Sequence, residues 1–112
     1  MRAEYHQCFR PKHGEILDVG NLKFEIRHSP GHTPGHIVLI EHDARTVFTG
    51  DCLFSGTIGR TDLPGGDHAQ LIDSITKNVL SLDDDFIVEC GHGPDTTVGV
   101  ERENNPFLNG SY

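Results

Sequence analysis

The chain has 112 residues and a formal net charge of −8, from 9 basic and 17 acidic side chains. This length fits a single domain, and the acidic balance argues against a protein that holds nucleic acid through its phosphates. No apolar run approaches the roughly 20 residues of a membrane-spanning helix, and no signal peptide is visible. Three cysteines without a Cys-x-x-Cys spacing argue against a disulfide scaffold. We therefore expect a cytoplasmic protein in a reducing compartment.

The first half of the chain predicts four short strands. Alternating apolar residues over residues 16–19 and 22–26 flank a Gly-Asn pair, which is typical of a β-hairpin. Residues 37–40 are all apolar and mostly β-branched, as in a strand that is buried on both faces. Residues 45–49 predict a partner strand for them, after a tight turn. The sequence therefore indicates two successive hairpins.

A long loop and a helix follow the hairpins. Residues 50–66 hold five glycines and one proline, and loops of this length in compact domains are usually functional or disordered. Asp67 is a good N-cap for a helix over residues 68–80. Apolar side chains at helical spacing give this helix one buried stripe, formed by Leu71, Ile72, Ile75 and Val79.

The end of the chain predicts one more strand and one more helix. Residues 86–89 form the strand, and a Gly/Pro loop over residues 90–96 follows it. Thr97 is placed to cap a short helix that stops before Pro106. The order of strands and helices predicts an α/β fold with helices on one face of a sheet.

Side chains that bind metals follow three of the predicted strand ends. His32 and His36 lie in a Ser-Pro-Gly-His-Thr-Pro-Gly-His run, Asp51 follows the fourth strand, and His92 follows the last. Imidazole and carboxylate suit zinc or iron, and loops at one edge of a sheet can bring such ligands together. The prolines and glycines of the run exclude a helix, so it forms a turn. On the residues alone, histidines that only bond to the backbone in tight turns remain the alternative.

The motifs together resemble a known family. In chain order they are Ser-Pro-Gly-His-Thr-Pro-Gly-His at 29–36, Phe-Thr-Gly-Asp-Cys-Leu-Phe at 48–54, Gly-Arg-Thr-Asp-Leu-Pro-Gly-Gly at 59–66, Gly-His-Gly-Pro at 91–94 and the closing segment at 96–108. This combination resembles the metallo-β-lactamase-fold hydrolases, and within them the glyoxalase II-like (hydroxyacylglutathione hydrolase-like) branch. The resemblance covers about residues 15–108.

The resemblance implies a dinuclear zinc site between the two sheets of an αββα sandwich. His32 matches a histidine on the first metal, and His92 matches the last histidine on the second. Asp51 matches the aspartate that bridges both metals, and it is the catalytic candidate. Water held between two zinc ions becomes a hydroxide nucleophile near neutral pH. The implied reaction is hydrolysis of a thioester such as an S-acyl glutathione.

One motif of the family is missing from the chain. Its leading His-x-His-x-Asp-His signature occurs nowhere in the sequence, and it would lie upstream. We therefore expect residues 1–112 to form the C-terminal half of the domain, one mixed sheet with helices on one face, without the N-terminal half. On this basis we expect the chain alone to be inactive or weakly active.

The missing half has a consequence for assembly. The sheet face opposite the helices, from alternate residues of 22–26, 37–40 and 47–48, would lack its partner sheet. An exposed apolar face marks an interaction surface. We therefore expect a homodimer, or association with the missing N-terminal half.

Other residues near the motifs carry supporting predictions. We expect His36 to orient the His32 turn. Arg60 and Asp62 are expected to pair and organise their loop, with a surface ion pair as the alternative. Cys52 and Cys90 are candidate soft ligands, with free, buried cysteines as the favoured interpretation.

Two other functions are kept open. The Gly-Arg-Thr-Asp sequence at 59–62 also resembles the persulfide dioxygenases, which hold one iron through two upstream histidines and the equivalents of His32 and Asp51. The second alternative is a non-catalytic half-domain that associates with a partner. The native metal, one iron or one to two zincs, separates the two enzymatic hypotheses.

Overall fold

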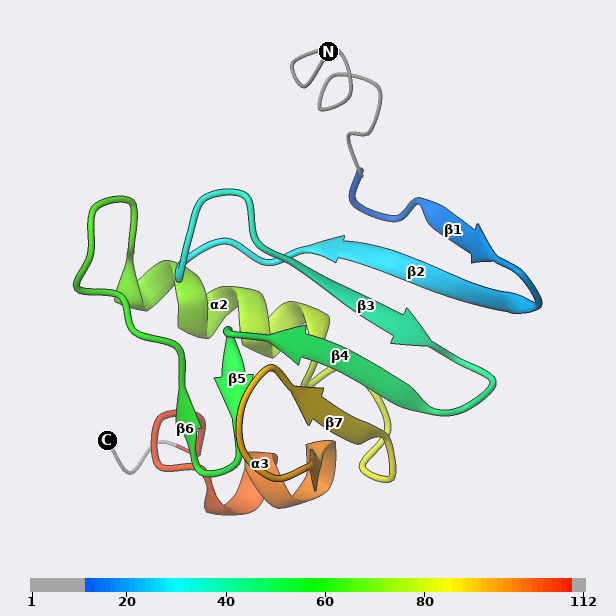
Figure 1. Cartoon of the computed structure of the whole chain (residues 1–112). Coiled ribbons are helices and arrows are strands. Elements are labelled where there is room, and N and C mark those ends of the chain that lie inside the picture. The colour runs from blue at the N-terminus through cyan, green and yellow to red at the C-terminus, as the bar shows by residue number, and fades with distance from the viewer. Residues whose placement is uncertain (1–11, 110–112) are drawn as a thin grey trace, which may run out of the picture.

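A computed structural model describes residues 12–109 of the chain, and its main feature is a six-stranded mixed sheet with the strand order β1-β2-β3-β4-β7-β8 (Figure 1). A small two-stranded sheet pairs β5 with β6. The strands are β1 (Ile16–Val19), β2 (Leu22–His28), β3 (Ile37–Glu41), β4 (Thr46–Gly50), β5 (Leu53–Phe54), β6 (Thr57–Ile58), β7 (Ile87–Cys90) and β8 (Thr96–Thr97), and the helices are α2 (His68–Asn78) and α3 (Val98–Asn104). The mixed sheet with two helices confirms the α/β prediction.

The two predicted hairpins are present. β1 to β4 pair antiparallel in chain order, whereas β7 pairs parallel to β4. The Asp67 side chain accepts a hydrogen bond from the main-chain N–H of Gln70 and caps α2, and Thr97 caps α3 in the same way. The prediction was wrong in the loop over residues 50–66, which contains β5 and β6, and at the end of the loop over residues 90–96, where β8 begins at Thr96. Each of these strands has two residues, which is too short to show an alternation of apolar and polar residues.

The core lies between one face of the sheet and the helices. The strand side chains that point to this face are fully buried: Val38, Ile40, Val47 and Val88. They form one cluster with Leu71, Ile75 and Val79 of α2 and its C-cap and with Val98 of α3. Both helices therefore cover the same face, as predicted. Among the described residues, no helix is long and apolar enough to cross a membrane.

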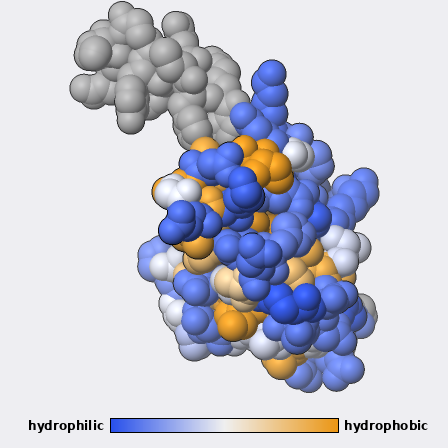
Figure 2. All heavy atoms as spheres, turned by 90° about the vertical axis from the view of Figure 1, so that its right-hand side faces the viewer, coloured by the Kyte–Doolittle hydropathy of each residue, from blue (hydrophilic) through white to orange (hydrophobic). Residues whose placement is uncertain are grey.

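The other face of the sheet carries a second set of apolar side chains. Phe24, Leu39 and Phe48 point to this side and are half-buried. The Phe24 and Phe48 rings meet edge to face, with 5.9 Å between their centroids. At the far end of the sheet Val19 and Leu22 are exposed, and the surface seen from that end shows separate apolar patches among hydrophilic side chains (Figure 2).

Candidate metal site

The three loops that carry the predicted ligands meet at one edge of the six-stranded sheet. β4 and β7 are parallel, with Gly50 opposite Cys90. The residues that follow the two strands therefore leave the sheet at the same end. β2 and β3 are joined there too, because His28 pairs with Ile37. This topology places the His32 turn, Asp51 and the His92 loop beside one another.

Asp51 and His92 are in direct contact. The Asp51 Oδ1 atom lies 3.3 Å from the His92 Nδ1 atom, and the two side chains are 47% and 82% exposed. The Gly91 N–H donates to the Gly50 carbonyl over 2.9 Å and holds the two loops together. A Cβ atom on Gly91 would lie 3.0 Å from Asp51 Oδ1, so the missing side chain leaves room in front of the carboxylate.

His32 is held by the main chain of another loop. Its Nδ1–H donates to the Arg60 carbonyl oxygen over 2.8 Å, which leaves Nε2 as the ring nitrogen with a free lone pair. A Cβ atom on Gly59 would lie 2.0 Å from the Asp51 carbonyl oxygen and 3.3 Å from His32 Nδ1. Glycine at position 59 therefore lets the chain pass between the His32 ring and the backbone of Asp51.

The turn before His32 is fixed to α2. A Cβ atom on Gly31 would lie 2.3 Å from the Leu71 Cα atom, so the turn contacts the helix backbone directly. The Gly31 carbonyl accepts a hydrogen bond from the Asp67 N–H over 2.7 Å. The Ser74 hydroxyl donates to the Pro30 carbonyl, also over 2.7 Å. These contacts connect the position of His32 to the packing of α2 on the sheet.

His36 contacts the backbone rather than the Asp51–His92 pair. Its Nε2 atom lies 2.9 Å from the Thr49 carbonyl oxygen, at the end of β4. Its ring stands perpendicular to the His32 ring, with 6.0 Å between centroids. This placement suits the predicted role in orienting the His32 turn.

The three predicted ligands are only partly brought together. Within residues 12–109, no group of three His, Cys, Asp or Glu side chains is arranged to hold a metal ion. Asp51 and His92 meet through their side chains, whereas His32 is placed by Gly59 beside the main chain of Asp51. Their common role as metal ligands remains a prediction.

The two cysteines beside this edge have different surroundings. Cys52 is fully buried in the core cluster. Burial, with a smaller effect from the Asp51 charge, raises the pKa of its thiol to about 12. Because a metal binds the thiolate, this environment favours the buried-cysteine interpretation. The Cys90 Sγ donates to the Pro94 carbonyl over 3.4 Å, within the His92 loop.

Arg60 and Asp62 form the expected ion pair. Arg60 Nε and Nη2 donate to the two carboxylate oxygens over 2.9 and 3.1 Å, which raises the pKa of Arg60 and lowers that of Asp62. The side chains are 61% and 69% exposed, so this pair contributes little to stability. The sequence pointed to these side chains, but it is the main-chain carbonyl of Arg60 that contacts a candidate ligand.

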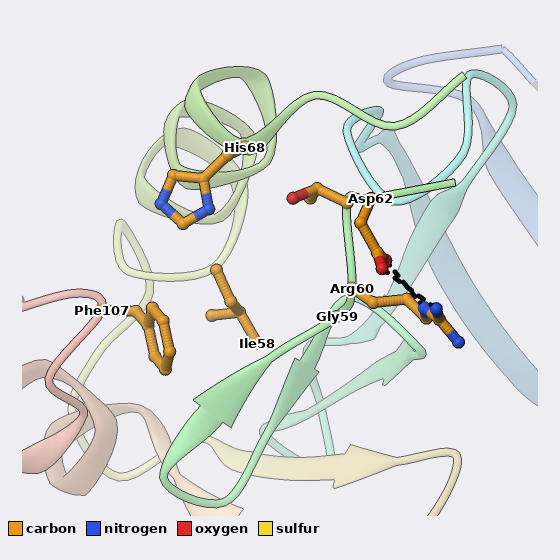
Figure 3. A pocket seen from close by; sticks show the side chains of 7 residues that line it. Ile58, Gly59, Arg60, Asp62, His68 and Phe107 are labelled. Carbon is orange, nitrogen blue, oxygen red and sulfur yellow. Dashed lines mark hydrogen bonds and ion pairs between the residues drawn. The ribbon is translucent and has the colours of Figure 1, made fainter. Parts of the chain in front are cut away.

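A pocket of about 410 Å³ borders the site through Gly59. Ile58, His68 and Phe107 line one side of it, and the Arg60–Asp62 pair extends on the other (Figure 3). The His68 and Phe107 rings are 6.3 Å apart. No sequence motif marks His68, because the contact depends on how α2 and the end of the chain pack together.

Comparison with known proteins identifies the family. Residues 9–92 match the family model described as Metallo-beta-lactamase superfamily. The chain is 57% identical over 96 residues to hydroxyacylglutathione hydrolase GloC of Haemophilus influenzae, a match that covers 86% of this chain and 45% of that protein.

Two solved structures show the same fold. ETHE1 from Myxococcus xanthus superposes with a TM-score of 0.84 at 36% identity, over 90% of this chain and 46% of its own. TTHA1623 in a di-iron-bound form gives 0.80 at 41% identity, over 89% and 48%. The chain thus spans a little under half the length of these relatives. On the match over residues 9–92, the chain belongs to the metallo-beta-lactamase superfamily of metal-dependent proteins.

Proposed function

We propose that this chain carries part of the active site of a glyoxalase II-like metallo-hydrolase that cleaves a thioester of the S-acyl glutathione kind. The contact between Asp51 Oδ1 and His92 Nδ1 carries the proposal, because it places two metal-binding side chains from separate loops together. The 57% identity to hydroxyacylglutathione hydrolase GloC supports the choice of substrate class.

The donor set fits zinc or iron. His32 offers the Nε2 lone pair, His92 an imidazole and Asp51 a carboxylate, which are the donors that both metals accept. The space left open by Gly91 in front of Asp51 suits an ion bound by the carboxylate. A bound metal of this type activates water and polarises a carbonyl group.

The residues of the chain have separate tasks in this proposal. The Arg60 carbonyl fixes the tautomer and the direction of the His32 ring. Asp51 and His92 are exposed and therefore accessible to a substrate. Phe54 lies beside His92, with 6.4 Å between the ring centroids. The pocket past Gly59, with Ile58 and Phe107, is the candidate space for the organic part of the substrate.

Three ligands do not complete a dinuclear site. The chain aligns with 45% of the length of GloC, and we propose that the remaining ligands come from the part of the domain outside this alignment. The isolated chain is then expected to bind metal weakly and to turn over slowly, because lost ligands reduce metal occupancy first.

A mononuclear-iron persulfide dioxygenase is the second candidate. The Gly-Arg-Thr-Asp sequence at 59–62 favours it, and so does the similarity to ETHE1. TTHA1623, in its di-iron-bound form, is a similar structure that holds iron, but as two ions rather than the single ion of this candidate. A third candidate, the non-catalytic half-domain, predicts no metal-dependent reaction.

The reaction is tested by supplying zinc or ferrous iron to the purified chain. An S-acyl glutathione and glutathione persulfide with oxygen serve as the two substrates. The proposal predicts slow thioester cleavage with zinc, abolished by a chelator and by Asp51→Asn but retained in Asp43→Asn, an exposed control in the β3–β4 turn. Oxygen consumption with iron would favour the dioxygenase instead. A chain that neither binds zinc or iron nor turns over either substrate would support the non-catalytic half-domain.

A further inference from the structure

The most enclosed acidic side chain of the described residues lies in α3. Glu101 is 1% exposed. One of its carboxyl oxygens accepts hydrogen bonds from the Gly56 N–H and from Asn105 Nδ2, both over 2.9 Å. The other accepts one from the Thr96 hydroxyl over 2.7 Å. The two oxygens therefore have three donors from three different segments of the chain.

Asn105 extends this network. Its side chain is fully buried, and its Nδ2 also donates to the Thr57 carbonyl over 3.1 Å. Its Oδ1 accepts a hydrogen bond from the Phe107 N–H over 3.0 Å. The end of α3 is thus bonded to the turn of the β5–β6 hairpin and to the segment that carries a wall of the pocket.

Two of the partners of Glu101, Gly56 and Thr96, belong to the segments that follow Asp51 and His92. Gly56 lies in the β5–β6 hairpin, which begins two residues after Asp51. At the base of that hairpin the Gly59 N–H donates to the Cys52 carbonyl over 3.0 Å. Thr96 begins β8, directly after the exposed loop that holds His92. A single buried carboxyl group therefore connects both sides of the Asp51–His92 pair.

The hydrogen bonds of the buried Glu101 carboxyl group favour a role in fixing the positions of its partners. Burying a carboxyl group is costly unless it is hydrogen-bonded, and even buried ion pairs can often be replaced by apolar residues of similar volume without loss of stability. Hydrogen bonds, in contrast to apolar contacts, fix direction as well as distance. The His92 loop itself is exposed from residue 91 to residue 95, so it has little packing of its own to hold it.

We propose that Glu101, supported by Asn105, is a positioning residue that holds the His92 loop and the Asp51 segment in register for metal binding. This inference rests on the proposed metal site. Groups that hydrogen-bond directly to metal ligands typically contribute about 10–100-fold to metal affinity. Thr96 and Glu101 lie one step further from the candidate ligands, so a loss at the lower end of this range is expected when the bond between them is removed.

The test uses a matched pair of variants at position 96. Thr96→Val keeps the shape of the side chain and removes the donor, whereas Thr96→Ser keeps the hydroxyl. Zinc ion affinity is measured by calorimetry, the His92 ring and the amides of residues 91–95 are followed by NMR without metal, and stability is measured by urea unfolding. We expect Thr96→Val to bind zinc about tenfold more weakly and to shift the loop signals, while Thr96→Ser stays close to wild type.

A second substitution separates the hydrogen bonds of Glu101 from its charge. In Glu101→Gln the amide oxygen still faces Gly56 and Asn105, and the amide group donates to the Thr96 oxygen, so zinc affinity should be close to wild type. A folded Thr96→Val chain with unchanged zinc affinity and unchanged His92 signals would overturn the inference. A wild-type chain that binds no zinc would instead refute the proposed metal site. The inference would then fail as well, even if Thr96→Val shifted the signals of the His92 loop.

Discussion

The Nδ1 atom of His32 lies 2.8 Å from the main-chain oxygen of Arg60, 28 residues later in the chain. A carbonyl accepts only from a protonated ring nitrogen, so this bond selects the tautomer in which Nε2 carries the lone pair. Such an outer bond is the usual way in which proteins orient a metal-binding histidine. Because the partner is a main-chain atom, substitution of the Arg60 side chain should leave this bond in place.

Gly59 tests how close the loops at the site approach. In Gly59→Ala the added Cβ would meet the Asp51 carbonyl at 2.0 Å, so the backbone must shift. We expect a loss of about 1–3 kcal/mol in the free energy of unfolding, together with weaker zinc binding. Gly35→Ala is the control, because nothing lies within 4 Å of a Cβ there. Equal stability and zinc affinity in both variants would show that the close approach at Gly59 is absent in solution.

Ile75 tests the packing of α2 on the sheet. It is fully buried in the core cluster, and Ile75→Ala should lower the free energy of unfolding by about 2–5 kcal/mol. Leu63→Ala is the control, since Leu63 is 50% exposed. Urea denaturation followed by circular dichroism gives both values. A small effect at position 75 would contradict the position of α2.

Glu25 gives a prediction on pH. Its hydrogen bond to Arg27, the largest cause, and that to His42 hold the pKa of Glu25 below its ordinary value of 4.5. A depressed pKa in the folded state stabilises the protein above the unfolded pKa, and this contribution is lost as pH falls through the folded pKa. We therefore expect the free energy of unfolding to decrease below about pH 4.5, and less steeply in Glu25→Gln. The exposed control Glu103→Gln should keep the slope of the wild type.

The outer face of the sheet gives a prediction on assembly. Phe24, Leu39 and Phe48 are half-buried there, and their apolar area should drive association. We expect the sedimentation coefficient to rise with concentration, as in a two-fold dimer, and Leu39→Ser to reduce this effect. Val100→Ser, at an exposed position of α3, should not. A concentration-independent monomer would show that this face needs no partner.

The fold could be predicted where local signals agree. Asp67 and the apolar spacing from Leu71 to Val79 predicted α2, because a cap and a period of 3.6 residues are visible in sequence. β5, β6 and β8 were not predicted, since strands of two residues carry no period. Their pairing is fixed by distant partners such as Glu101 and Asn105, whose bonds to Gly56 and Thr57 span 45 and 48 residues.

The candidate site was found through motifs, but its arrangement could not be predicted from them. The contact between Asp51 and His92 depends on the parallel pairing of β4 with β7, which no local pattern encodes. The support of His32 by a main-chain oxygen is independent of the side chain at position 60. A motif shows side chains and not main-chain contacts. The sequence therefore pointed to the Arg60–Asp62 pair, whereas the close approach of the chain at Gly59 is visible only in the structure.

The central claim is that His32, Asp51 and His92 bind one metal site. Its most direct test is a titration of the purified, metal-free chain with zinc ions, monitored by NMR of the histidine rings. The account predicts that zinc ions move the ring signals of both His32 and His92, that His42, just past the end of β3, stays unchanged, and that Asp51→Asn weakens the response of both rings. A His32 or His92 ring that does not respond to zinc, or responses that are unaffected by Asp51→Asn, would contradict it.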